Sequence, residues 1–213
     1  LVEVSAFTFM ALLVAREGTY VTGGHQIMSN LAALCYMMPM ALGVATAALT
    51  AQAIGAGNLA HAHRTGMAGL ALGLIGALLT AAVLLAGRPL ILAAYTDDAG
   101  VAAVATTLLA VLPLFHLFDS MQCINSYLLR AYKVAVVPLL LQVVALAGVG
   151  LVGGWWFGFG PGKGGLDGVR NILVPGSPVG AGSMWLMAMV GLALSAALLH
   201  FWYRRIVRTM AQP

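Results

Sequence analysis

Charged residues interrupt this chain only at wide intervals, and the segments between them are long and apolar. Asp, Glu, Lys and Arg make up 8% of the 213 residues, whereas an ordinary soluble domain carries roughly a quarter. A folded chain with so few charges cannot cover its exterior with polar side chains, so lipid must solvate most of its surface. Composition therefore excludes a soluble globular protein and predicts a membrane protein.

The apolar segments have the length and character of membrane-spanning helices. A helix of ~20 mostly apolar residues crosses the ~30 Å of hydrocarbon in a bilayer. These runs are rich in Leu and Ala and lack the alternation of barrel strands, so helices are expected. The fold class predicted is therefore all-α, a polytopic membrane protein with six transmembrane helices in one domain, residues 1–213. The expected spans are residues 1–15, 24–53, 65–87, 101–129, 138–157 and 181–203.

Basic residues indicate how such a bundle is oriented. Six spans place both chain ends on one side, and the connections on that side contain six basic residues against four on the other. By the positive-inside rule, both ends are expected in the cytoplasm. The net charge of +4 is therefore interpreted as topology, and no nucleic-acid partner is expected. Residues 158–183, rich in Gly and Pro, are expected to form an exposed and mobile outer connection.

Two acidic residues, Glu3 and Asp119, lie within the predicted spans. An ionisable side chain at bilayer depth costs ~2.5–3.5 kcal/mol on insertion scales, which makes each acid a candidate functional residue. Their estimated depths differ by ~6 Å at 1.5 Å per residue, so the two carboxyl groups are able to meet. The alternative is that each acid is satisfied by local hydrogen bonds and only holds helices together.

Neutral polar residues accompany the acids. Helical spacing places His116 and Gln122 on the same face as Asp119. Gln26 and Asn30 lie near the outer end of the second span. For each of these side chains alone, interhelical hydrogen bonding is the simpler interpretation than ligand contact. A close pair of carboxyl groups can share a proton or bind a small hard cation such as sodium through oxygen ligands, and Pro113 predicts a kink beside them.

Four stretches of the sequence occur in an order and spacing that together form a pattern. They are the helix that begins with Glu3; His25-Gln26-Ile27 with Pro39, Gly43, Ala45 and Gln52-Ala53-Ile54-Gly55-Ala56-Gly57; Asp119 and Gln122 with Leu129-Arg130-Ala131 and Pro138; and Pro178-Val179-Gly180-Ala181-Gly182-Ser183-Met184-Trp185. This pattern resembles the multidrug and toxic compound extrusion (MATE) family, NorM-like branch. The resemblance covers the whole chain and corresponds to the carboxy-terminal lobe.

The resemblance implies a bacterial inner-membrane antiporter of two six-helix lobes around a central cavity, with the amino-terminal lobe as partner. Such transporters export cationic, lipophilic drugs in exchange for sodium ions or protons, and they are neither enzymes nor cofactor proteins. Glu3 and Asp119 match the acids of the cation site, and would hold sodium if sodium is the coupling ion. Residues expected to line the cavity are Gln26, Asn30, Phe115, His116 and Gln122. Phe115 stands where some members have a Tyr, and it has no hydroxyl to donate.

Two other functions remain open at this point. A flippase for a lipid-linked saccharide is related in fold, but such proteins carry more basic residues in the cavity than these spans provide. A membrane anchor that holds haem b between histidines is also open, since His25, His116 and His200 lie in or near spans. Haem requires axial ligands at matched depth on facing helices, and no pair of these histidines fits well.

Overall fold

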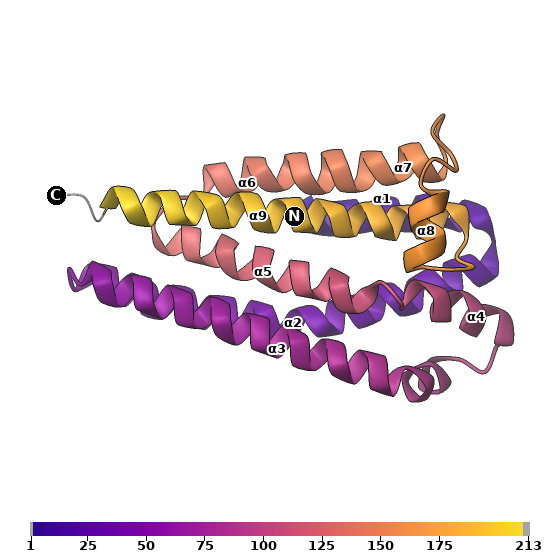
Figure 1. Cartoon of the computed structure of the whole chain (residues 1–213), viewed down its shortest axis with the longest axis horizontal. Helices are drawn as coiled ribbons and strands as arrows, with labels where there is room; N and C mark the ends of the chain where they lie inside the picture. Colours follow the sequence, from indigo (N-terminus) through magenta and orange to yellow (C-terminus); the bar gives the residue numbers. More distant parts are fainter. Residues whose placement is uncertain (1, 211–213) are drawn as a thin grey trace.

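The computed structural model describes the backbone of residues 2–210 and the side chains of residues 5–210. All regular structure in this part of the chain is helical (Figure 1), which confirms the predicted all-α class. The elements are α1 (Val2–Val14), η1 (Ala15–Glu17), α2 (Thr19–Gly55), α3 (Leu59–Tyr95), α4 (Ala99–Leu108), α5 (Leu112–Ala131), α6 (Val136–Gln142), η2 (Val143–Val152), α7 (Gly153–Gly158), α8 (Asp167–Leu173) and α9 (Val179–Met210).

The long helices lie side by side along one axis, with α5 at the centre of the bundle (Figure 1). α5 packs against α2, α3 and α9, while α1 packs mainly against η2. The larger buried cluster of apolar side chains surrounds Phe115 and Trp185. A smaller cluster lies nearer the carboxy-terminal end of α9 and includes Tyr203. Because α5 is enclosed on several sides, it is the helix on which polar side chains are best shielded from lipid.

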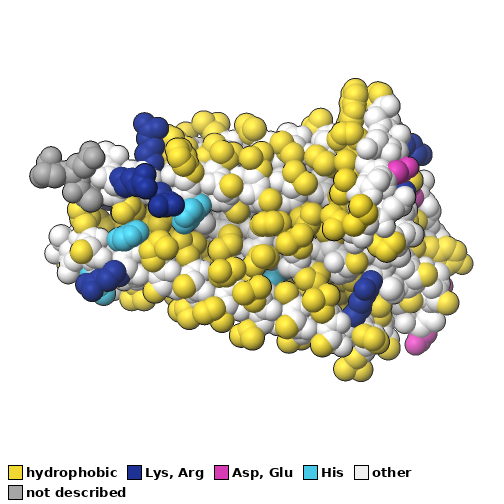
Figure 2. Space-filling model, in the orientation of Figure 1, with side chains coloured by type: hydrophobic (Ala, Val, Ile, Leu, Met, Phe, Trp, Pro, Cys, Tyr) yellow, Lys and Arg dark blue, Asp and Glu magenta, His cyan; other side chains and the backbone are white. Residues whose placement is uncertain are grey.

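The surface between the two ends of the bundle is apolar (Figure 2). Four helical segments of the described chain have the length and hydropathy of membrane spans, namely α2, α3, the α6–η2–α7 rod and α9. The bent pair α4–α5 provides a fifth span. α1 corresponds to the first predicted span, and its 13 residues are fewer than a complete crossing requires. The chain is thus a multi-pass membrane protein.

The fourth predicted span is broken rather than straight. α4 and α5 meet at an angle of 52°, and Pro113 lies in the first turn of α5. Proline lacks the N–H that continues a helix and its ring clashes with the preceding turn, so it fits best in the first turn of a helix and tends to bend a helix elsewhere. The kink predicted from Pro113 is therefore confirmed. Pro39 lies inside α2, which continues without a break to Gly55.

The fifth span contains a π-helix, η2, between the short helices α6 and α7. Its wider turns bring backbone rather than side chains against α9. A Cβ atom added to Gly191 of α9 would lie 2.6 Å from the carbonyl oxygen of Ala145 and 3.2 Å from the Cα of Gly150. Only glycine fits at such a distance. The two spans therefore approach each other through their main chains.

Two expectations about the ends of helices are wrong. The third span was expected to end at Arg88 and Pro89, but α3 continues through both residues to Tyr95. The residues after Pro89 are apolar, so the helix gains burial in lipid that outweighs one missing hydrogen bond. The sixth span was expected over residues 181–203, but α9 runs over Val179–Met210, and the connection before it contains the short helix α8.

Candidate functional site

The most buried acid among the described side chains is Asp119, in the middle of α5. Its side chain is 3% exposed, and His116 and Gln122 on the same helix are each 1% exposed. The three side chains are enclosed because α2, α3 and α9 cover α5. The expected polar stripe of α5 is therefore an internal surface of the bundle, at a depth where water is scarce.

Several polar side chains of this stripe bond to other helices. The Nε2 of Gln142, in α6, donates to Oε1 of Gln122 at 2.7 Å. The thiol of Cys123 donates to the hydroxyl oxygen of Tyr36, in α2, at 3.5 Å. Ser120 donates to the carbonyl oxygen of Gly73, in α3, at 3.3 Å. Interhelical hydrogen bonding, the simpler interpretation of these neutral residues, therefore accounts for Gln122.

His116 differs from its neighbours on α5. Both nitrogens of its ring are buried, and neither has a hydrogen-bond partner within the described residues. Buried polar atoms are almost always paired, so such atoms indicate a partner that is water, an ion or another part of the protein. His116 precedes Asp119 by one helical turn. The inner surface of α5 thus presents hydrogen-bonding capacity that the neighbouring helices do not use.

An aromatic group lies one helical turn before Asp119 along α5. Phe115 of α5 packs against Phe7 of α1 with ring centroids 6.2 Å apart, and against Trp185 of α9 at 5.3 Å. α1 and α5 run in opposite directions (Figure 1). Glu3 lies four residues before Phe7, and Asp119 lies four residues after Phe115, so both positions fall on the same side of the Phe7–Phe115 contact. The side chain of Glu3 lies outside the described residues.

Gln26 and Asn30 lie apart from this group. Both are exposed on α2, and the Oδ1 of Asn30 accepts a hydrogen bond from Tyr95 of α3 at 2.6 Å. A small apolar pocket of about 30 Å³ between α1, η2 and α9 is lined by Phe115, but not by the other four residues expected to line a cavity. The structure therefore brings together Phe115, His116, Asp119 and Gln122 on α5, and places Gln26 and Asn30 elsewhere.

Some polar contacts could not be foreseen from the sequence. The Nε1 of Trp185 donates to Nδ1 of His25 at 3.2 Å, and Nε2 of His25 pairs with Ser29 at 3.4 Å. Because both ring nitrogens are engaged, His25 has none left to ligate haem. The thiol of Cys35, in α2, lies within electrostatic range of the Asp119 carboxyl group. The only signal for these contacts was the presence of polar residues inside apolar spans.

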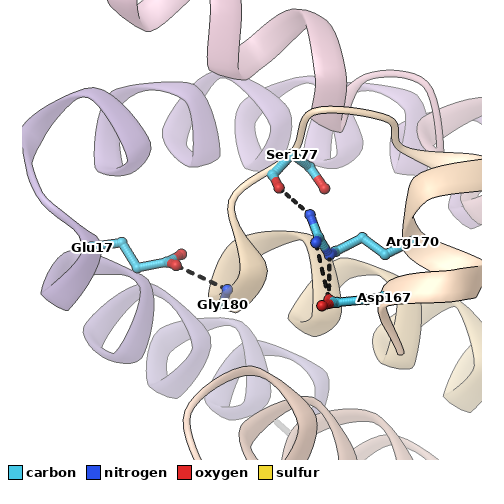
Figure 3. Close-up of polar contacts among 5 residues, drawn as sticks. All are labelled: Glu17, Asp167, Arg170, Ser177 and Gly180. Carbon is cyan, nitrogen blue, oxygen red and sulfur yellow. Dashed lines mark hydrogen bonds and ion pairs between the residues drawn. The ribbon is translucent and has the colours of Figure 1, made fainter. Parts of the chain in front are cut away.

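A second polar cluster lies at the end of the bundle where η1 meets the start of α9 (Figure 3). The carboxylate of Glu17, at the end of η1, accepts hydrogen bonds from the backbone N–H groups of Gly180 at 2.9 Å and Ala181 at 2.7 Å. A negative group at this position satisfies free N–H groups and complements the positive end of the dipole of α9. Glu17 therefore fixes the junction between α1 and α2 to the start of α9.

Arg170 makes its polar contacts within the connection between α7 and α9 (Figure 3). Its guanidinium group is 2.9 Å from Oδ1 of Asp167 and also donates to the carbonyl oxygen of Ser177. Arg170 is buried, although the connection lies at the surface. These contacts explain why the connection contains ordered structure where a mobile loop was expected.

Comparison with known proteins identifies a family. Residues 1–156 match the MatE family. A protein of Aromatoleum aromaticum named "Probable multidrug resistance protein NorM" is 36% identical over 99% of this chain. A protein of Xylella fastidiosa with the same name is 33% identical, also over 99% of the chain. The match covers 43% and 41% of these two relatives, respectively, and falls in their carboxy-terminal lobe.

Solved structures show the same fold. The crystal structure of the eukaryotic MATE transporter AtDTX14 superposes with a TM-score of 0.80 at 16% identity, over 96% of this chain and 44% of that one. An inward-facing multidrug resistance MATE family transporter superposes with a TM-score of 0.79 at 14% identity, over 100% of this chain and 46% of that one. The chain thus spans less than half the length of the proteins that it matches.

Proposed function

We propose, because this chain belongs to the MatE family of transporters, that it works as the carboxy-terminal lobe of a multidrug exporter. The transporter lies in the bacterial inner membrane and exports cationic, lipophilic compounds in exchange for sodium ions or protons. The coupling ion binds at Asp119 together with Glu3. The observation that carries this proposal is the burial of Asp119 in the centre of a membrane-spanning bundle.

The burial of an ionisable side chain such as Asp119 costs free energy, and a neutral residue could hold the helices together without this cost. Acids at bilayer depth are rare, and they mark ion pathways, proton relays and substrate sites. The ring of His116, which has no hydrogen-bond partner within the described residues, lies on the same helix and is able to contact a bound ion. A cationic cargo also suits an acidic site better than an anionic cargo does.

The geometry of α1 and α5 supports Glu3 as the second acid. The Phe7–Phe115 contact fixes the register of the two antiparallel helices near the site. From that contact, four residues along each helix rise ~6 Å towards the same end of the bundle, at 1.5 Å per residue. We therefore expect Glu3 and Asp119 at similar depth in the bundle. One sodium ion or one proton is sufficient to bridge two carboxyl groups so placed.

Neutralisation of this pair drives the exchange. Two negative charges in a medium of low dielectric constant repel each other strongly, and a bound cation removes that repulsion. A protein with two packings close in free energy then changes from one to the other. The outward-facing state loads the cation and releases the drug, and the inward-facing state releases the cation and binds drug again. The 52° bend between α4 and α5 is a natural place for such movement, since no continuous helix crosses it.

The rest of the transporter comes from outside this chain. The relatives are more than twice as long, and their amino-terminal half supplies the other wall of the cavity. Transporters built from repeated halves bind their cargo at the interface between the halves. The polar face of α5 lies inside this half rather than at that interface, because α2, α3 and α9 cover it. By the positive-inside rule, the end of the bundle where most basic residues gather faces the cytoplasm.

The test is the replacement Asp119→Asn in the protein that contains both halves. Asparagine has nearly the same shape but cannot become negative, so it neither releases a proton nor attracts a cation. We expect ion-driven export of a cationic dye to be lost, whether it is measured as efflux from whole cells or as uptake into inverted membrane vesicles. The amount of protein in the membrane should be unchanged. Imposing a sodium gradient and a pH gradient separately identifies the coupling ion.

Asp119→Glu and Ser126→Ala are the matched controls. Glutamate retains the charge, so part of the efflux should return. Ser126 lies two helical turns beyond Asp119 and is equally buried, so its replacement tests whether any change in the core of α5 has the same effect. Normal ion-driven efflux by the Asp119→Asn protein would remove the carboxyl pair from the mechanism.

A further inference from the structure

Basic side chains gather at the end of the bundle where α3 begins and where α5 and α9 end (Figure 2). Three segments form this end, residues 56–66, 127–136 and 200–210, and none of them contains Asp or Glu. Six of the ten basic residues of the chain lie in these segments, namely Arg64, Arg130, Lys133, Arg204, Arg205 and Arg208. With no acid among them, their charge is available to an anionic partner.

Tyr203 brings three of the helices together at this end. Its ring is fully buried and contacts His63 of α3 at 6.4 Å and Tyr132, after α5, at 5.9 Å, measured between ring centroids. Gly66 allows the close approach, since a Cβ at that position would lie 2.4 Å from the hydroxyl oxygen of Tyr203. The ends of α3, α5 and α9 are therefore held in one fixed arrangement.

Each residue of this aromatic group has a basic neighbour in the chain. Arg64 follows His63, Lys133 follows Tyr132, and Arg204 follows Tyr203. All three basic side chains are exposed. Three exposed cations thus lie in three segments that the contacts of Tyr203 hold together, at the basic end of the bundle. This is the level of the phosphate groups in a bilayer.

Lys133 occupies a backbone conformation that normally belongs to glycine. Its φ is +60°, the only positive φ of a non-glycine residue in the described part of the chain. The turn that closes α5 requires this conformation, since Lys133 N–H bonds to Arg130 O and Val134 N–H bonds to Leu129 O, each at 2.9 Å. The strained turn therefore places a cation where glycine would fit without strain.

Aromatic rings hold two further cations of this end in place. The guanidinium of Arg130 lies 4.9 Å from the ring centroid of Tyr127, and that of Arg205 lies 5.4 Å from the ring of Trp202. Such stacking limits the freedom of the long side chains and keeps them close to the helix surface. Both side chains are exposed at the same end of the bundle as Arg64, Lys133 and Arg204.

We propose that Arg64, Lys133 and Arg204 form a binding site for the phosphate of an anionic phospholipid. The lipid chains lie along the apolar surfaces of α3 and α9, and the headgroup lies over Tyr203. Basic pockets between the ends of membrane helices bind headgroups of this kind, because the cations and the apolar surface match the two parts of the lipid. The proposal does not depend on the transport activity.

The test measures thermal unfolding of the full chain, purified in detergent, with three additives. These are dioleoylphosphatidylglycerol, dioleoylphosphatidylcholine and inorganic phosphate. We expect only the anionic lipid to raise the midpoint of unfolding, in a saturable way. Lys133→Gly and the double variant Arg64→Gln/Arg204→Gln should each weaken this effect, with an affinity loss of about fivefold for each cation removed.

Lys133→Gly separates charge from folding. Glycine relieves the strained turn, so without lipid this variant should unfold at the same temperature or higher, while its response to the anionic lipid decreases. Lys163→Gln, an exposed lysine at the opposite end, is the matched control and should respond as the unaltered chain does. Three results would each overturn the proposal: an equal shift with phosphatidylcholine or with inorganic phosphate, an undiminished response of both variants, or an equal loss in Lys163→Gln.

Discussion

A single missing methyl group determines how closely α9 approaches the π-helix η2. Gly191 is buried, and its neighbours include a carbonyl oxygen, which cannot move aside as a flexible side chain would. We expect Gly191→Ala to destabilise the folded protein by ~1–3 kcal/mol, the usual cost of overpacking. Thermal unfolding in detergent measures this loss directly.

Gly148 provides the comparison for this prediction. It lies in η2, but a Cβ added there would meet nothing within 4 Å. Gly148→Ala should therefore leave the midpoint of unfolding nearly unchanged. Equal stability of the Gly191→Ala and Gly148→Ala proteins would contradict the close packing of the two main chains.

Single residues also show what the sequence could and could not predict about the site. Asp119 was predictable because an acid inside an apolar run is rare, whatever its surroundings. The contact between Trp185 and His25 was not predictable, because it depends on the register between α2 and α9, and periodicity within one helix carries no information about it. Gln26 shared the polar character of the site residues but faces outward, since only tertiary packing decides which face of α2 is covered.

Among whole elements, the start of α9 is secured by a residue far away in the sequence. Glu17 accepts from two of the first N–H groups of this helix, which would otherwise be unsatisfied. We expect Glu17→Ala to free these groups at a cost of ~1 kcal/mol, the typical value of a helix cap. Hydrogen exchange at Gly180 and Ala181 should accelerate about fivefold, as a loss of that size in local stability requires.

Asp98 offers a control for this prediction, because it caps α4 by accepting from Val101 N–H at 2.9 Å, three residues away. Asp98→Ala should accelerate exchange in the first turn of α4 and leave Gly180 and Ala181 unchanged. Unaltered exchange at Gly180 and Ala181 in the Glu17→Ala protein would show that the carboxylate does not hold α9.

Helices as elements were more predictable than their ends and breaks. Long apolar runs have few alternatives in lipid, so the helical class followed from hydropathy alone. The end of α3 was predicted wrongly because Pro89 was taken to end the helix. Proline is a weaker indication of a helix end when apolar residues follow it, since they favour continuation of the helix in lipid. The ordered outer connection was missed because the ion pair of Arg170 and Asp167 joins residues that are neighbours only once α8 has formed.

The described part of the molecule has a buried polar surface on α5 and a basic end, and the face drawn in Figure 2 is mainly apolar between its two ends. Neither the polar surface of α5 nor the basic end forms a continuous pathway for a drug across a membrane. The relatives that this chain resembles are more than twice as long, and cargo sites of such transporters lie between two halves.

We therefore expect this chain, produced alone in a drug-sensitive bacterium, to enter the membrane but to confer no resistance to cationic drugs. Its helices satisfy their own backbone hydrogen bonds, so insertion requires no partner. Alternating access requires two bodies that move against each other, so export should appear only when the amino-terminal half of a relative is produced with it. Growth in the presence of a cationic dye measures export, and the amount of the chain in the membrane fraction is the control. Resistance conferred by this chain alone would show that α5 and its neighbours form a complete pathway, for instance between two copies of the chain.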